Sequence, residues 1–170
     1  MEAFQITDMS NAQIEHSVII NNFVRVVGYA MKNSICKVFG EGIQFQWEES
    51  GRKKYTPDAF IICSFKHRSS TVMHEVPRMI LEVLSPSTED YDRNDKLNAY
   101  GKAGVGEVWL LDWRKQTIEI YICDDDGTSQ GTKPYLYLTV TENNKEELKL
   151  VNFPITKIDF DAVMDLSILY

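Results

Sequence analysis

A carboxylate in the middle of an apolar run is the most informative residue of the chain. Glu82 lies in the run Ile-Leu-Glu-Val-Leu at residues 80–84, and the two-residue period of a strand puts it on the same face as Ile80 and Leu84. Burying an unpaired carboxylate is costly, so this position needs a metal ion, a cation or a set of hydrogen bonds. A structural ion pair, or a hydrogen bond from the strand end to a loop, is the competing interpretation.

Two further charged residues stand beside apolar runs. Asp58 directly follows Pro57 and begins an apolar run, although Asp after Pro is also ordinary turn chemistry. Lys96 falls on the apolar side of a predicted helix, with Tyr100 one turn later. Its amine therefore either pairs with Asp92, one turn earlier, or points across to the carboxylates of the sheet.

These three side chains have the chemistry of metal-assisted phosphodiester hydrolysis. Asp58 and Glu82, on adjacent inner strands, would form the hard oxygen site that Mg²⁺ (or Mn²⁺) prefers, and the backbone carbonyl of Val83 is a candidate third ligand. The amine of Lys96 would then lie near the metal-bound water or the scissile phosphate. A bound metal lowers the pKa of its water and stabilises developing charge, while the lysine orients that water or helps to deprotonate it.

A mixed α/β fold must position these residues, with helices packed on a central sheet. Apolar residues recur at helical spacing over residues 11–31 and again over 89–103, which predicts a helix in each range. Strands are expected within 37–48 and over 58–63, 78–84, 108–112, 117–123, 135–140 and 147–151, with a short closing helix over 158–164. Residues 1–170 contain no repeat, low-complexity segment or obvious linker, and we expect a single domain.

The composition fits a globular protein, but its charge argues against non-specific binding to nucleic acid. The 170 residues are 44% hydrophobic, and the formal net charge is −7 at pH 7. Non-specific DNA binding depends on Lys and Arg side chains that neutralise phosphates. Contacts to DNA would therefore have to come from local basic clusters, at residues 52–54 and 66–68, each of which is also typical of a solvated loop.

The sequence gives no sign of a membrane protein or of a secreted, disulfide-rich one. No stretch reaches the roughly 18 apolar residues that span a bilayer, and the N-terminus lacks the basic start and apolar run of a secretory signal. Cys36, Cys63 and Cys123 are widely spaced and lack CxxC spacing, so we expect reduced, mostly buried thiols and no zinc site. Together these features predict a cytoplasmic protein.

Several of these residues fall within a larger pattern. Its segments are Thr56-Pro57-Asp58, then Leu-Glu-Val-Leu-Ser-Pro-Ser-Thr at 81–88, then Asp92, Lys96 and Tyr100, and finally Gly-Val-Gly-Glu-Val-Trp-Leu-Leu-Asp at 104–112. The pattern resembles the Uma family of proposed restriction endonucleases, a branch of the PD-(D/E)XK nuclease superfamily. The resemblance covers about residues 11–121, and the Glu-Val-Leu-Ser-Pro-Ser-Thr run with its trailing Lys and Tyr is its most specific part.

The resemblance implies a restriction-endonuclease-like fold and Mg²⁺-dependent cleavage of DNA. It implies that Asp58 and Glu82 are the metal carboxylates. In the general superfamily pattern the lysine follows the acidic residue by two positions on the same strand, and here that position is Leu84. The Uma family resembles a variant whose lysine has moved to the following helix, which corresponds to Lys96.

Three other residues are secondary candidates. Many superfamily members use an acidic residue of the first helix, and Glu15 is available there, although its place at the edge of the apolar stripe favours a solvated charge. His16 projects into the centre of that stripe, which favours a buried, hydrogen-bonded core histidine. Tyr100 is expected to pack close to the site and can hydrogen-bond there.

Three hypotheses for function remain open from the sequence. The first is an active Mg²⁺-dependent endonuclease that acts on DNA, for which cleavage of both strands would call for a homodimer. The second is a binding or regulatory module that keeps the nuclease fold with weak catalysis, as the acidic net charge and the absent strand lysine suggest. The third is a self-associating structural protein that uses the aromatic strand around residues 135–137 as its interface.

Overall fold

A six-stranded mixed sheet forms the centre of the molecule, in the order β1-β3-β5-β6-β7-β8. The computed structural model describes residues 2–123, 134–153 and 156–170. The strands are β1 (Lys37–Phe39), β3 (Ala59–Ile62), β5 (Met79–Val83), β6 (Glu107–Asp112), β7 (Thr117–Ile122) and β8 (Tyr135–Val140). The inner strands β3, β5 and β6 are buried along their whole length, as their two-sided apolar patterns predict.

The pairing of β5 with β6 is parallel, whereas the other pairings within this sheet are antiparallel. A parallel pair needs a crossover connection, and here a helical segment supplies it. This crossover consists of α2 (Glu89–Tyr91), the π-helical turn η2 (Asp92–Lys96) and α3 (Leu97–Ala103). The segment matches the helix predicted over 89–103, and it lies over the strand that carries Glu82.

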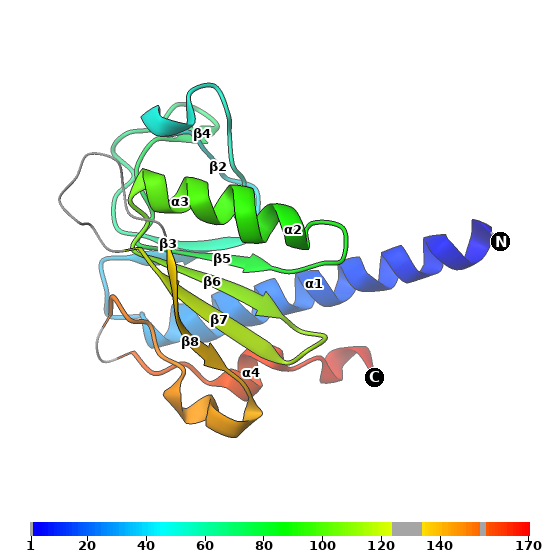
Figure 1. The fold of residues 1–170 in the computed structure, drawn as a ribbon. Coiled ribbons are helices and arrows are strands. Elements are labelled where there is room, and N and C mark those ends of the chain that lie inside the picture. The colour runs from blue at the N-terminus through cyan, green and yellow to red at the C-terminus, as the bar shows by residue number, and fades with distance from the viewer. Residues whose placement is uncertain (1, 124–133, 154–155) are drawn as a thin grey trace.

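Helices cover both faces of the sheet (Figure 1). The long helix α1 (Glu2–Ala30) and the short α4 (Phe160–Met164) pack on one face, and the α2–η2–α3 crossover packs on the other (Figure 1). The apolar stripe predicted over residues 11–31 is buried at Ile19, Ile20, Phe23 and Val27 of α1 and at Met31, the residue after it. The helix begins earlier than the predicted residue 11, at Glu2.

Beyond the crossover lies a small parallel sheet of β2 (Gln44–Phe45) and β4 (Val72–Met73), with the 3-10 turn η1 (Glu48–Ser50) beside it (Figure 1). Two more 3-10 turns, η3 (Glu142–Glu147) and η4 (Ser167–Leu169), occur near the C-terminus. The strand predicted over 147–151 is wrong, because that segment makes a single bridge, between Lys149 and Lys157. The closing helix predicted over 158–164 is confirmed as α4.

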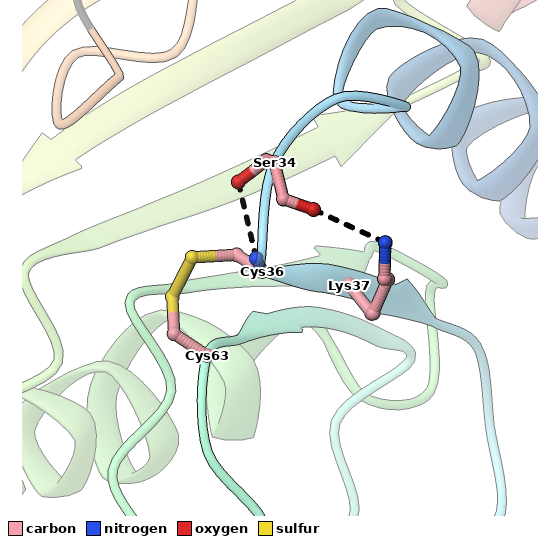
Figure 2. Close-up of a disulfide and its surroundings, with 4 residues drawn as sticks. All are labelled: Ser34, Cys36, Lys37 and Cys63. Carbon is pink, nitrogen blue, oxygen red and sulfur yellow. Dashed lines mark hydrogen bonds between the residues drawn. A yellow bond between two sulfur atoms is a disulfide. The ribbon is translucent and has the colours of Figure 1, made fainter.

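The prediction of three reduced cysteines is wrong for two of them. Cys36 and Cys63 form a disulfide that links the residue before β1 to the residue after β3 (Figure 2). Antiparallel register explains this bond, because Lys37 pairs with Ile62 and the two cysteines therefore stand opposite each other one step further along. Their separation of 27 residues in the sequence gives no hint of this proximity.

Nothing in the described helices would cross a bilayer. None of them combines the length with the apolar character that a membrane span requires.

Candidate active site

Strand alternation directs Glu82 toward the crossover. On β5 the odd-numbered residues pack with α1, whereas Ile80 and Leu84 belong to the core cluster that contains Tyr100 of α3. Glu82 lies between these two residues and therefore faces the same helix. The Glu82 side chain is 1% exposed, which leaves it dependent on protein groups for compensation.

Two side chains of the crossover compensate this carboxylate. The Lys96 amine donates a hydrogen bond to Oε2 of Glu82 at 2.8 Å, and the Tyr100 hydroxyl donates one to Oε1. Burial raises the pKa of Glu82 to about 8, and the negative charge of Asp58 acts in the same direction, while Lys96 and Tyr100 oppose the rise. The ionised form of Glu82 is therefore disfavoured both by its burial and by the nearby charge of Asp58.

The wide turn η2 places a second acid beside Lys96. Asp92 is 2% exposed, and its Oδ1 lies 3.0 Å from the Lys96 amine. Its Oδ2 accepts a hydrogen bond from the Thr88 hydroxyl at 2.8 Å. Lys96 was predicted either to pair with Asp92 or to point to the carboxylates of the sheet. It does both, because its amine bridges Asp92 and Glu82. π-Helical turns are rare and occur frequently at functional sites.

The surroundings of Lys96 keep its amine protonated. Burial opposes the protonated amine, but the neighbouring Glu82 and Asp92 carboxylates outweigh that effect and raise the pKa of Lys96. The lysine side chain is 15% exposed, so its amine lies between the buried acids and solvent. It remains a cation at neutral pH.

Asp58 ties the start of β3 to β5 and α1. Ala59 pairs with Leu81, so Asp58 falls one step further along, opposite Glu82. Its Oδ2 accepts the backbone N–H of Val83 at 2.7 Å and lies 3.2 Å from Nε2 of His16. This carboxylate therefore meets the end of β5 and the first helix at one point.

His16 lies beside Asp58 and not in the apolar core, where the helical pattern had predicted it. The hydrogen bond with Asp58 is the main cause of a raised His16 pKa; burial opposes it, and the Asp58 and Glu41 charges and the Val83 backbone add to it. Nδ1 of His16 lies 3.8 Å from Oε1 of Glu41. Ligand atoms of His16, Glu41 and Asp58 all lie within 4.8 Å of one another, which is a spacing that can hold a metal ion.

The predicted residues differ in how far the structure brings them together. Hydrogen bonds join Glu82 to Lys96 and Tyr100, whereas Asp58 contacts His16. The two groups face each other across the β3–β5 pairing, and the charge of Asp58 acts on Glu82. Glu15 lies apart from both groups and accepts a hydrogen bond from the Tyr170 hydroxyl at 3.0 Å.

Sequence reasoning missed Glu41, which is 54% exposed in the loop before β2. The only signal for it was a pair of flanking glycines, of which Gly42 adopts a φ of +105°. Glycine is the default residue in this left-handed region, so the loop conformation that presents Glu41 depends on it.

The chain is similar to known proteins over most of its length. The Uma2 family model, described as "Putative restriction endonuclease", matches residues 5–152. The uncharacterized protein slr1290 of Synechocystis sp. is 29% identical over 149 residues, which cover 86% of this chain and 74% of that protein.

A solved structure has the same fold. It is a "putative nuclease belonging to DUF820" from Anabaena variabilis, and it superposes with a TM-score of 0.63 at 19% identity, covering 88% of this chain and 80% of that one. The predicted fold class, a restriction-endonuclease-like mixed sheet flanked by helices, is confirmed.

Proposed function

The chain belongs to the Uma2 family, and we propose that it is a divalent-metal-dependent endonuclease that hydrolyses phosphodiester bonds of DNA. One observation carries the proposal: the Lys96 amine is held on the buried Glu82 carboxylate, which stands opposite Asp58 at the end of the same sheet. Two neighbouring carboxylates that can bind a metal ion, together with a cationic side chain, are the groups that metal-assisted phosphodiester hydrolysis uses.

The donor groups present suit a hard divalent cation such as Mg²⁺ or Mn²⁺. Asp58 and Glu82 supply carboxylate oxygens and Val83 a backbone carbonyl, which are the ligand types that these ions prefer. His16 and Glu41 extend the set toward the surface with an imidazole nitrogen and a further carboxylate. The raised pKa of Glu82, next to a second carboxylate, indicates a pocket that a cation would relieve.

When bound, the cation would lower the pKa of its water and stabilise charge on the phosphate. The protein side chains do the remaining work. Lys96, whose pKa the Glu82 and Asp92 carboxylates raise, supplies a positive charge that orients a water molecule or a phosphate oxygen. Tyr100 and Asp92 hold Glu82 and Lys96 in place, and His16 orients Asp58.

Incubation with supercoiled plasmid and Mg²⁺ or Mn²⁺ tests the proposal. We expect wild-type protein to nick or linearise the plasmid, Glu82→Gln to lose this activity, and the exposed-acid control Glu147→Gln to retain it. RNA of matching sequence tests the choice of DNA as substrate. Metal binding without cleavage of either nucleic acid would instead favour a nuclease-fold binding module, and the endonuclease proposal would be abandoned.

The same proposal extends to a homodimer, because cutting both strands of a duplex in one event calls for two active sites. The outer strand β8 carries Tyr135, Leu136 and Tyr137, which are each about half exposed. Sedimentation equilibrium of wild type beside Leu136→Glu measures the association. A monomer that nicks one strand at a time would retain the nuclease proposal and exclude the dimer.

A further inference from the structure

A hollow of about 310 Å³ lies beside the crossover helix, outside the cluster around Glu82. Trp47 and Tyr55 line one side of it, and Asn98 and Lys102 of the crossover helix line the other. Lys53, from the basic run that the sequence singles out at residues 52–54, also lines it. Part of this run therefore borders a defined concave surface.

The turn that presents Lys53 is held by several hydrogen bonds. The Ser50 hydroxyl donates to the carbonyl of Trp47 at 2.7 Å, and the Trp47 N–H donates to the Ser50 oxygen at 3.1 Å. The Gln46 side-chain amide donates to the carbonyl of Gly51 at 2.7 Å, and the Lys53 N–H donates to the carbonyl of Ser50 at 3.0 Å. Its backbone is thus ordered before any ligand arrives, which lowers the entropic cost of binding.

Aromatic rings connect this hollow to the candidate active site. The Lys53 amine lies 5.1 Å from the ring centre of Tyr55 and 5.0 Å from that of Tyr91. The Lys96 amine lies 5.8 Å from the same Tyr91 ring. On the inner side, Trp47 and Tyr55 pack edge-on against Tyr100, which holds Glu82. The hollow and the site therefore share walls.

The lining groups favour an anionic, hydrogen-bonding ligand. Lys53 and Lys102 supply two cations against one acid, Asp95, and Ser50 and Asn98 add neutral polar groups. The flanking Arg52 and Lys54 add positive charge to the same turn, against Glu48 and Glu49 at its start, in a chain whose net charge is −7. Stacking of a nucleobase is disfavoured, because Trp47 is 4% and Tyr55 7% exposed, and their ring faces are covered.

We propose that this hollow binds a backbone phosphate of the DNA strand, next to the phosphate that is cut, through Lys53 and Lys102. The inference rests on the proposed endonuclease function and names the place where the substrate strand is held outside the reacting centre. It explains how an acidic protein can engage a polyanion, since attraction is confined to one cationic turn and the facing helix.

The test measures binding of a fluorescent 30-base-pair duplex by anisotropy in Ca²⁺, over a series of salt concentrations. We expect Lys53→Ala/Lys102→Ala to weaken binding about tenfold and to reduce the slope of log K against log salt by about 1.8, the value for two lost phosphate contacts. The double Arg variant, which keeps both charges, should bind within about threefold of wild type. In steady-state cleavage, KM should rise while kcat stays unchanged.

The matched control is Lys32→Ala/Lys157→Ala, which removes the same charge from two exposed lysines elsewhere. Lys32 also lies over a tyrosine ring, with its amine 4.5 Å from the centre of Tyr29. Equal losses in both double variants, or wild-type affinity in Lys53→Ala/Lys102→Ala, would overturn the inference. If plasmid cleavage depends on Glu82 but not on these lysines, the inference alone is overturned. If Lys53→Ala/Lys102→Ala loses DNA binding but the wild-type protein cleaves no plasmid, the result counts against the endonuclease.

Discussion

Two glutamates in adjacent parallel strands are equally buried but differently satisfied. Glu107, at the start of β6, is 0% exposed, and Glu82, near the end of β5, is 1% exposed. Glu107 accepts hydrogen bonds from the backbone N–H groups of Val151 and Asn152, each at 3.0 Å, and from the Trp109 indole at 2.6 Å. Within the described part of the chain, Glu82 accepts hydrogen bonds from the Lys96 and Tyr100 side chains alone.

On the proposed function, Glu107 has a structural role and Glu82 a catalytic one. Burial raises the pKa of both groups. At Glu107 the opposing groups are mostly backbone donors, which join the segment at residues 151–152 to β6. At Glu82 a second acid adds to the rise, and the opposing groups are side chains that can move or pair with an incoming phosphate.

The largest expected effect is the loss of cleavage on substitution of Glu82, which substitution of Glu107 should not cause. Glu82→Gln should lower metal-dependent cleavage by a factor on the order of 10³, comparable to the loss of a key charge-stabilising group in other enzymes. Its melting temperature should not fall, because Gln keeps the shape of Glu82 and cannot carry the charge that burial and Asp58 disfavour. Plasmid cleavage and thermal unfolding of the same preparation measure both. A drop of several degrees with activity retained would reverse the assignment.

The opposite behaviour is expected at Glu107. Glu107→Ala leaves one buried and two partly buried N–H donors without their acceptor, so the free energy of unfolding should fall by about 3 kcal/mol. Cleavage per folded molecule should stay within about twofold of wild type. Urea denaturation measures the loss, with Glu147→Ala as the exposed control. An unchanged midpoint would mean that Glu107 does not anchor the C-terminal segment.

The next largest effects should distinguish the residue that binds the metal, Asp58, from the residues that support turnover, Lys96 and Asp92. Asp58→Ala should weaken Mn²⁺ binding sharply, whereas Lys96→Ala should leave it within about threefold and lower turnover roughly 100-fold. Asp92→Asn keeps the shape of Asp92 but weakens its hold on Lys96, and we expect about a tenfold loss of turnover with unchanged KM. Calorimetry gives the metal affinities. Unchanged affinity in both Asp58→Ala and Glu82→Ala would remove these carboxylates from the metal site.

The smallest expected effect is a pH dependence of stability in EDTA. The folded-state pKa of Glu82, about 8, lies above its unfolded value, so neutral Glu82 stabilises the fold at low pH and this stabilisation is lost as pH rises toward 8. Between pH 5 and pH 8 the unfolding free energy of wild type should fall relative to Glu82→Gln by at least about 1 kcal/mol. His16, with its raised pKa, adds a loss of the same sign to both proteins. Parallel curves for the two proteins would contradict the shift.

Residues that contradict their local pattern could be predicted from the sequence. Glu82 and Lys96 stand out because a charge interrupts an apolar face, and alternation and helical spacing then give the direction of each side chain. The crossover helix was also predictable, since its apolar spacing persists through the wide turn. These features depend on neighbours within about one helical turn.

Features that depend on pairing across the fold could not be predicted. The disulfide requires the register of β1 against β3, and Cys36 and Cys63 show no spacing that reveals it. Glu41 resembles any solvated loop acid until the loop conformation brings it to His16. The π-helical turn at Asp92–Lys96 leaves no distinct mark on residue spacing, although it brings both charged groups to one face.

That wide turn has a consequence for how the protein tolerates insertions and deletions. A π-helical turn holds one residue more than a regular turn, so removal of a single residue within 92–96 would restore an ordinary helix. Each residue of an α-helix turns the next by about 100°, and residues on the two sides of the deletion would therefore rotate relative to each other. Asp92 could then no longer hold the Lys96 amine while Tyr100 faces Glu82, and a relative that lost this extra residue would need a different source for its amine.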